Sequence, residues 1–215
     1  MEKEYGKKSR IMWVEALRIT ACFAVVLLHI NVRWLYSVPI HTLEWHVLNF
    51  WNSVTRFAVP VFFMISGLLY LEPSKKISIS DLYKKYIGKL FVSYWCWRVI
   101  YGAFDVIVYY EMRMEASALI KEILKTAILS PRMHMWYLPV FIGILAICPL
   151  LKLITDKRNM QLLAYCVLLF LVFGVLRSTV LLFQFPHKDL VAPILNAVSP
   201  EMLTGCIGFF LLGIL

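Results

Sequence analysis

The chain has 215 residues, of which 61% are hydrophobic and 16% are charged, and its formal net charge is +9. Its mean hydropathy is +0.74. A soluble domain of this length cannot turn so much apolar surface inward, so an ordinary soluble fold is excluded. We expect an all-α integral membrane protein.

Long apolar stretches divide the chain. They predict a polytopic helix bundle of about six spans, at 11–32, 47–71, 90–110, 135–154, 160–183 and 202–215. The last stretch covers roughly 21 Å as a helix, which is less than the ~30 Å of a hydrocarbon core. We therefore expect one transmembrane domain over 1–215 whose sixth span is truncated, in a chain that continues beyond Leu215.

Lys and Arg residues are shared unevenly between the connections. The set formed by 1–10, 72–89 and 152–159 holds twelve of them, and the alternate set holds six. The positive-inside rule then predicts a cytoplasmic N-terminus. The basic balance sets the topology, so the expected partner is membrane lipid and no nucleic-acid partner is expected.

The stretch "WVEALRITACFAVVLLHI" (13–30) places two ionisable residues inside the first predicted span. Arg18 and His29 are eleven residues apart, which is three helical turns, so both lie on one face with a rise of roughly 16 Å between them. Glu15 precedes Arg18 by three residues and is positioned to pair with it. Taken singly, Arg18 has a snorkelling interpretation and His29 an interfacial one. Together they predict the lining of a polar cavity.

The second predicted span carries an arginine as well. "TRFAVPVFFMISGLLYL" (55–71) places Arg56 midway along it, with Pro60 four residues later. Proline frees a backbone carbonyl, and Ser66 with Gly67 permits a kink or a close helix contact. Arg56 has no acidic residue within one turn, so its partner has to come from another helix, a bound anion or water.

Polar and aromatic residues open the fourth predicted span, at "SPRMHMWYLPV". His134 and Trp136 lie at its outer boundary, where an aromatic belt is ordinary. The alternative is that His134 borders the outward-facing polar cavity predicted for His29. Upstream, 111–130 predicts an amphipathic helix on the outer face, with Leu119, Ile123, Ala127 and Ile128 at helical spacing.

Two further local patterns predict structure. Ser80–Asp81 is a plausible N-cap for a short interfacial helix within 72–89. His41 and His46 lie five apart in a predicted loop without further ligands, and the five cysteines show no paired spacing, so no metal site is expected.

Four stretches of the sequence resemble a known family. Arg18, ten residues and His29 resemble the R-x10-H signature of the membrane acyltransferase-3 family. "RFAVPVFFMISGLLYL" resembles the second-span block of that family, and "HMWYLPVFIGILAICPLLK" is similar to its histidine–Trp–aromatic–Leu block. "IGFFLLGIL" resembles a mid-protein stretch. Glu15 stands where the family commonly has Asp, and members have roughly ten spans, so the resemblance covers their first half or more.

The resemblance implies an O-acyltransferase of the bacterial cytoplasmic (inner) membrane. It would move an acyl group, usually acetyl, from cytoplasmic acetyl-CoA to a hydroxyl of a cell-envelope sugar, glycan or lipid-linked sugar. Acetyl-CoA, or another acyl-CoA, would be a co-substrate, and no tightly bound cofactor is expected. Two other interpretations stay open: a small-solute transporter or export helper, and an inactive fragment of a longer acyltransferase.

Within that resemblance the polar residues take roles. Arg18 would hold the CoA phosphates by charge-assisted hydrogen bonds, and His29 would act as general base or carry the acyl group itself. Arg56 would assist with the phosphates or stabilise the oxyanion. The expected substrate pocket is completed by Glu15, Ser66, His134 and Trp136.

Overall fold

The computed structural model describes residues 12–72, 75, 78–110, 116–129, 133–155, 159–183, 188 and 205–215. Within these ranges every regular element is helical, and five helices are long and apolar enough to cross a membrane: Met12–Leu35, Leu43–Leu71, Ile79–Val108, Tyr137–Ile154 and Met160–Val180. The chain is an all-α multi-pass membrane protein, as predicted. Two parts of the predictions, the basic segment 1–10 and the start of the sixth apolar stretch near residue 202, lie outside the described residues.

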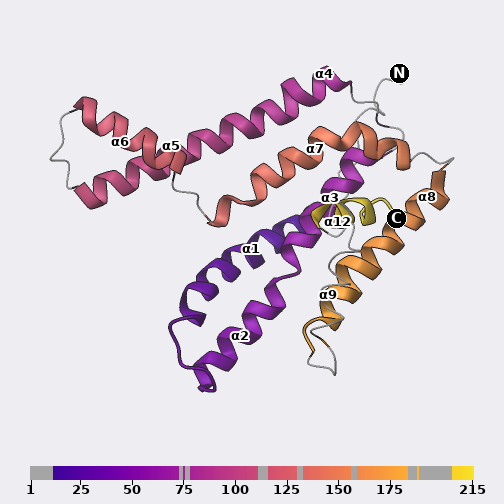
Figure 1. Cartoon of the computed structure of the whole chain (residues 1–215), viewed down its shortest axis with the longest axis horizontal. Helices are drawn as coiled ribbons and strands as arrows, with labels where there is room; N and C mark the ends of the chain where they lie inside the picture. Colours follow the sequence, from indigo (N-terminus) through magenta and orange to yellow (C-terminus); the bar gives the residue numbers. More distant parts are fainter. Residues whose placement is uncertain are drawn as a thin grey trace, which may run out of the picture. The chain divides into compact units, whose positions relative to one another are not determined.

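The helices pack into two compact units, 1–74 with 153–215 and 75–152. The first unit contains α1 (Met12–Leu35), α2 (Leu43–Thr55), α3 (Ala58–Leu71), α8 (Met160–Leu169), the π-helical η4 (Phe170–Leu176), α9 (Arg177–Val180) and α12 (Cys206–Leu212) (Figure 1). The second unit contains α4 (Ile79–Asp81), the π-helical η1 (Leu82–Ile87), α5 (Gly88–Tyr110), α6 (Ala116–Leu129), the 3-10 turn η2 (Met133–Met135) and α7 (Tyr137–Ile154) as far as Lys152.

Helices α1 and α2 form an antiparallel hairpin. Thr42 caps α2, because its Oγ1 accepts a hydrogen bond from the Trp45 N–H at 3.2 Å. This start places His46 inside α2, which corrects its predicted position in a loop. Farther along, the Asn31 Nδ2 donates to the Leu48 carbonyl at 2.5 Å and fixes the register between the two helices.

The second predicted span is two helices. α2 ends at Thr55 and α3 begins at Ala58, so the helix breaks at Arg56–Phe57, just before Pro60. Pro60 lies in the first turn of α3, where its missing N–H leaves no intrahelical bond unmade. The ring also cannot donate to the Arg56 carbonyl, so the turn that leads into the proline is the one that opens.

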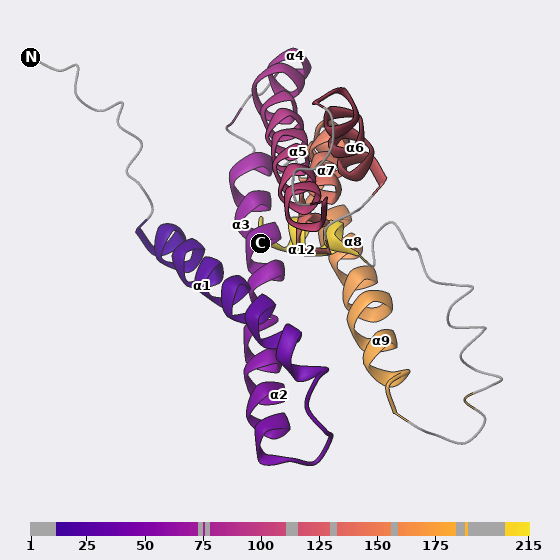
Figure 2. The same ribbon diagram turned by 90° about the vertical axis from the view of Figure 1, so that its left-hand side faces the viewer.

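Gly67 allows α3 to touch α12 backbone to backbone. A Cβ on Gly67 would lie 1.8 Å from the Phe210 carbonyl oxygen, and one on Gly213 would lie 2.0 Å from the Met64 carbonyl oxygen. The predicted close helix contact at Ser66–Gly67 is therefore confirmed, and its partner is the short α12, which lies against α3 in both views (Figures 1 and 2). Gly208 extends the seam, since its Cβ would enter the ring of Phe170 in η4.

Replacing Gly67 by alanine is expected to destabilise the protein. The added Cβ has to displace the backbone of α12, and overpacking of this kind costs about 1–3 kcal/mol. Gly143→Ala in α7 is the matched control, because a Cβ there meets nothing within 4 Å. Thermal unfolding in detergent should show a lower midpoint for Gly67→Ala and an unchanged or raised midpoint for Gly143→Ala. Equal midpoints for the two variants would contradict the contact.

The N-cap of α4, the first helix of the second unit, lies two residues before its predicted position. The Ser78 Oγ accepts a hydrogen bond from the Asp81 N–H at 3.0 Å, so Ser78 is the N-cap and the predicted Ser80–Asp81 cap is wrong by two residues. Lys85 pairs with Asp81 at 2.8 Å one turn later. The π-helical η1 then leads into α5 without a gap, so this segment extends the span and is not a separate interfacial helix.

Helix α6 packs along α5 through its predicted apolar positions. Leu119 and Ile123 are half-buried, Ala127 is buried, and Ile128 is exposed, so the predicted face is confirmed except at Ile128. Gly102 of α5 lies directly against the α6 backbone, because a Cβ there would be 2.9 Å from the Ile123 carbonyl oxygen. Residues 111–115 and 130 of the predicted helix lie outside the described residues.

Candidate functional site

Arg18 and Glu15 form the predicted pair at the first turns of α1. The Arg18 Nη1 lies 3.4 Å from the Glu15 Oε1, and the two side chains are 40% and 42% exposed. A pair this exposed and this long is weak. The guanidinium therefore keeps donors that can reach a second anion.

His29 lies three turns along the same helix as Arg18. The buried stripe of α1 consists of Val14, Ala21, Ala24, Asn31 and Leu35. Arg18 is half-buried and His29 is exposed, so the face that they share flanks this stripe instead of forming part of it. Both side chains thus have room to meet a ligand that approaches α1.

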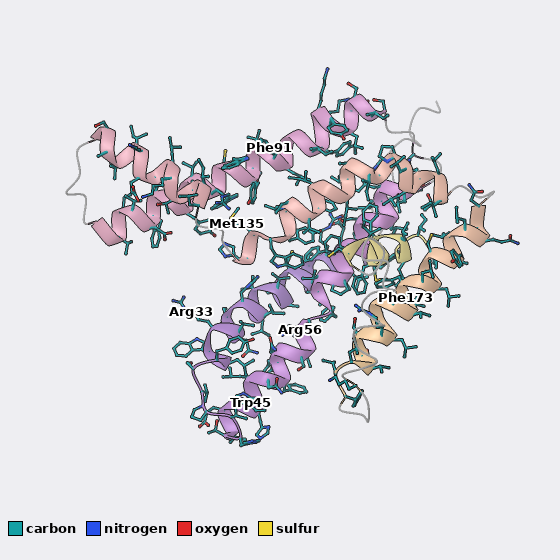
Figure 3. The ribbon with its side chains drawn as sticks, in the orientation of Figure 1. Arg33, Trp45, Arg56, Phe91, Met135 and Phe173 are labelled. Atoms are coloured by element: carbon teal, nitrogen blue, oxygen red, sulfur yellow. The ribbon has the colours of Figure 1, made fainter. Side chains whose placement is uncertain are left out.

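Arg56 occupies the break between α2 and α3, midway along the apolar segment Leu43–Leu71. Figure 3 shows it leaving this junction. Its side chain is exposed, and within the part of the chain that the structure describes no carboxylate pairs with it. An exposed guanidinium at this place in an apolar segment is costly unless an anion or water accompanies it.

The register of the first unit orders the three side chains by depth. Asn31 meets Leu48 near one end of the α1–α2 hairpin, and Ala21 and Ala24 meet Ala58 at the start of α3. Arg56 lies between Leu48 and Ala58 along the chain, so its height falls between those of Ala21 and Asn31 on α1. Arg18, Arg56 and His29 therefore succeed one another across the membrane, with roughly 16 Å between the first and the last.

An apolar pocket of about 220 Å³ lies beside the Arg18 end of α1. Its walls come from α1, α3 and the end of α12: Trp13, Leu17, Val61, Met64, Ile65, Leu68, Leu212, Gly213 and Leu215. No charged side chain belongs to this lining, so the pocket fits an apolar group and not the phosphates that Arg18 would hold.

Ser66 faces its own helix. The Ser66 Oγ donates a hydrogen bond to the Phe62 carbonyl at 2.7 Å, and the side chain is half-buried. This back-bond satisfies the hydroxyl within α3. The structure thus places Ser66 beside the Gly67 seam.

His134 and Trp136 belong to the second unit, at the start of α7. The His134 ring packs edge-on against Tyr101 of α5 with the ring centroids 5.0 Å apart. Trp136 is 44% exposed and meets Tyr137 at 6.4 Å in the same manner. These rings form an aromatic surface between the end of α6 and α7.

Two buried asparagines were missed by the sequence analysis. Asn31 is 4% exposed and Asn52 is 5% exposed, and Asn52 lies one turn before Arg56 on α2. The Asn52 Oδ1 has no hydrogen-bond partner in the described structure. The signal that could have identified them is the presence of a polar amide within an apolar span.

Metal ligands do not gather in the described ranges, where no group of three His, Cys, Asp or Glu residues could hold an ion. In the first unit Arg18, Arg56 and His29 offer two cations and an imidazole, and in the second unit the rings of His134 and Trp136 offer an aromatic surface. Such groups suit a polyanionic ligand and a proton transfer.

The comparisons with known proteins give one match. A family model described as an acyltransferase domain, of the acyltransferase-3 type, matches residues 11–215, which is almost the whole chain. No curated protein and no solved structure matches the chain.

Proposed function

The chain belongs to the acyltransferase-3 family and is a membrane acyltransferase, and from this premise we propose that it transfers an acetyl group from cytoplasmic acetyl-CoA to a hydroxyl of a cell-envelope sugar or lipid-linked sugar. The membrane is then the bacterial inner membrane, with the N-terminus in the cytoplasm, as the distribution of Lys and Arg favours.

The observation that carries the proposal is Arg56. It is an exposed cation midway along an apolar segment, at a helix break, and between Arg18 and His29 in depth. Coenzyme A is a polyanion with a long, thin arm that ends in the thioester. Arg18 and Arg56 supply guanidinium groups for its phosphates, and the arm leads the thioester toward His29.

His29 then acts on the acceptor. As the acceptor oxygen attacks the thioester carbonyl, the imidazole takes the hydroxyl proton. The carbon–sulfur bond breaks, the acetyl group stays on the acceptor oxygen, and the CoA thiolate leaves and receives a proton. Imidazole is the side chain that most often performs this general-base step.

His134 and Trp136 serve the acceptor in this proposal. Their rings lie together on the second unit, on a surface that suits sugars. Glu15 pairs only weakly with Arg18, so an incoming phosphate can displace it.

The test is transfer of label from acetyl-labelled acetyl-CoA. Membranes that contain the chain should move label into an envelope fraction, and membranes without it should not. Arg18→Ala should raise the KM for acetyl-CoA about tenfold or more, because charge-assisted hydrogen bonds contribute about 1.5–3 kcal/mol. Normal acetyl-CoA affinity in Arg18→Ala would refute the phosphate role. Transport of a small solute with no dependence on acyl-CoA would replace the proposal by a transporter.

A further inference from the structure

Arg98 is a buried arginine in the second unit, within the span formed by η1 and α5. It is 6% exposed, and each of its nitrogen groups has a partner. Its Nε donates to the Ala127 carbonyl, its Nη2 to the Ile128 carbonyl at 2.9 Å, and its Nη1 to the Tyr94 hydroxyl at 3.1 Å. The guanidinium also lies over the rings of Tyr94 and Trp95, at 5.6 and 5.7 Å from their centroids.

Two of these bonds reach the last turn of α6. The final four carbonyls of a helix receive no hydrogen bond from a donor within that helix. In an apolar setting, each carbonyl left without a donor is costly. Arg98 satisfies two of them with one planar group that also carries the charge favoured at a helix C-terminus. These hydrogen bonds therefore attach the C-terminal end of α6 to α5 at the position of Arg98.

His134 of η2 also packs against α5, close to Arg98. Tyr101, three residues after Arg98, packs against the His134 ring, and His134 is the sixth residue after Ile128. Gly102, the next residue of α5, lies against the α6 backbone at Ile123 and Ala127. The last turns of α6 and the ring of His134 thus contact neighbouring positions of α5.

We infer that Arg98 is a positioning residue: it anchors the C-terminal end of α6 so that His134 and the following aromatic residues stand at a fixed place for the acceptor. This rests on the proposed function only in the acceptor role of His134. The anchoring itself is a geometric statement and is testable without any activity.

The geometric test is cross-linking. In a chain whose five native cysteines are replaced by alanine, Tyr101→Cys and His134→Cys are joined by a short bis-methanethiosulfonate reagent. Adding Arg98→Gln should slow this reaction about tenfold, because loss of two or three charge-assisted hydrogen bonds frees the end of α6. Arg177→Gln is the matched control, since the Arg177 Nε donates to the Phe173 carbonyl in its own helical segment. An unchanged rate in Arg98→Gln would overturn the inference.

Kinetics give the functional half of the test. Arg98→Gln should raise the KM for the acceptor and leave the KM for acetyl-CoA unchanged, and it should add nothing to His134→Ala in a double variant. Arg98→Lys, which keeps the charge and donors, should restore part of the effect. Tyr94→Phe is a milder variant that keeps the protein folded should Arg98→Gln fail to insert.

The outcomes separate the two claims. Slow cross-linking with no effect of His134→Ala on transfer keeps the anchor and removes the acceptor role of His134. Equal losses in acetyl-CoA affinity, acceptor affinity and thermal stability would show a general structural residue and reject positioning.

Discussion

His29→Ala is expected to lose acyl transfer by about 10²–10⁴-fold while still binding coenzyme A. The physical reason is that an acceptor hydroxyl is a poor nucleophile until a base takes its proton, and His29 is the imidazole on the α1 face that also carries Arg18. Donor binding depends on Arg18, roughly 16 Å from His29 in depth, and on Arg56 between them, so affinity for coenzyme A should change little. The measurement is initial rate of label transfer beside equilibrium binding of coenzyme A.

His46→Ala is the control for this result. His46 is an exposed histidine on α2 of the same unit, where its ring packs on Trp45 at 5.2 Å. It should transfer label at the normal rate. A His29→Ala protein within threefold of the wild-type rate would exclude the base. Label that stays on the wild-type protein in the absence of acceptor, and is lost in His29→Ala, would change the role from base to acyl carrier.

Arg56→Met is expected to weaken binding of coenzyme A by about 10–100-fold, because a charge-assisted hydrogen bond to an anion contributes about 1.5–3 kcal/mol. The same change should not lower the thermal stability of the unliganded protein. No carboxylate among the described residues pairs with Arg56, so methionine removes a costly exposed charge from an apolar segment and breaks no ion pair.

Because Arg56→Met should weaken coenzyme A binding without lowering the stability of the unliganded protein, thermal unfolding with and without coenzyme A tests both expectations. Coenzyme A should raise the unfolding midpoint of the wild-type protein and should not raise that of Arg56→Met at the same concentration. Arg33→Met is the matched control: Arg33 is an exposed arginine near the end of α1 (Figure 3), and its variant should keep the ligand-dependent shift. A normal shift in Arg56→Met would mean that the donor does not reach the helix break.

The spans were predictable from sequence because the hydrophobic run that crosses a bilayer is long and nearly free of charge. All five predicted spans of full length correspond to observed helices, with ends displaced by local caps such as Thr42 and Ser78. The displaced ends have a common cause. Several serines and threonines near a helix start fit the residue preference for an N-cap. Which of them caps the helix depends on the backbone conformation around it.

Tertiary partners were not predictable in this way. The sequence marks Gly67 as permissive of close contact but does not indicate α12 as the helix that approaches it. Arg98 likewise looks like any other charged residue in a span, because its partners are backbone carbonyls, which every residue possesses. The packing of Ala58 against Ala21 and Ala24 of α1 is likewise a tertiary contact that no local pattern contains.

The Gly67–Phe210 contact has a consequence for biogenesis. Its two sides lie about 140 residues apart in the chain, so at 5–20 residues per second the ribosome needs roughly 7–30 s between making them. During that interval the side of α3 that carries Gly67, about three helical turns beyond the Arg56 break, has no α12 to pack against. We expect lipid to cover this side of α3 until α12 is inserted. Assembly of the first unit is therefore a late event, paced by translation and not by the insertion of its own early helices.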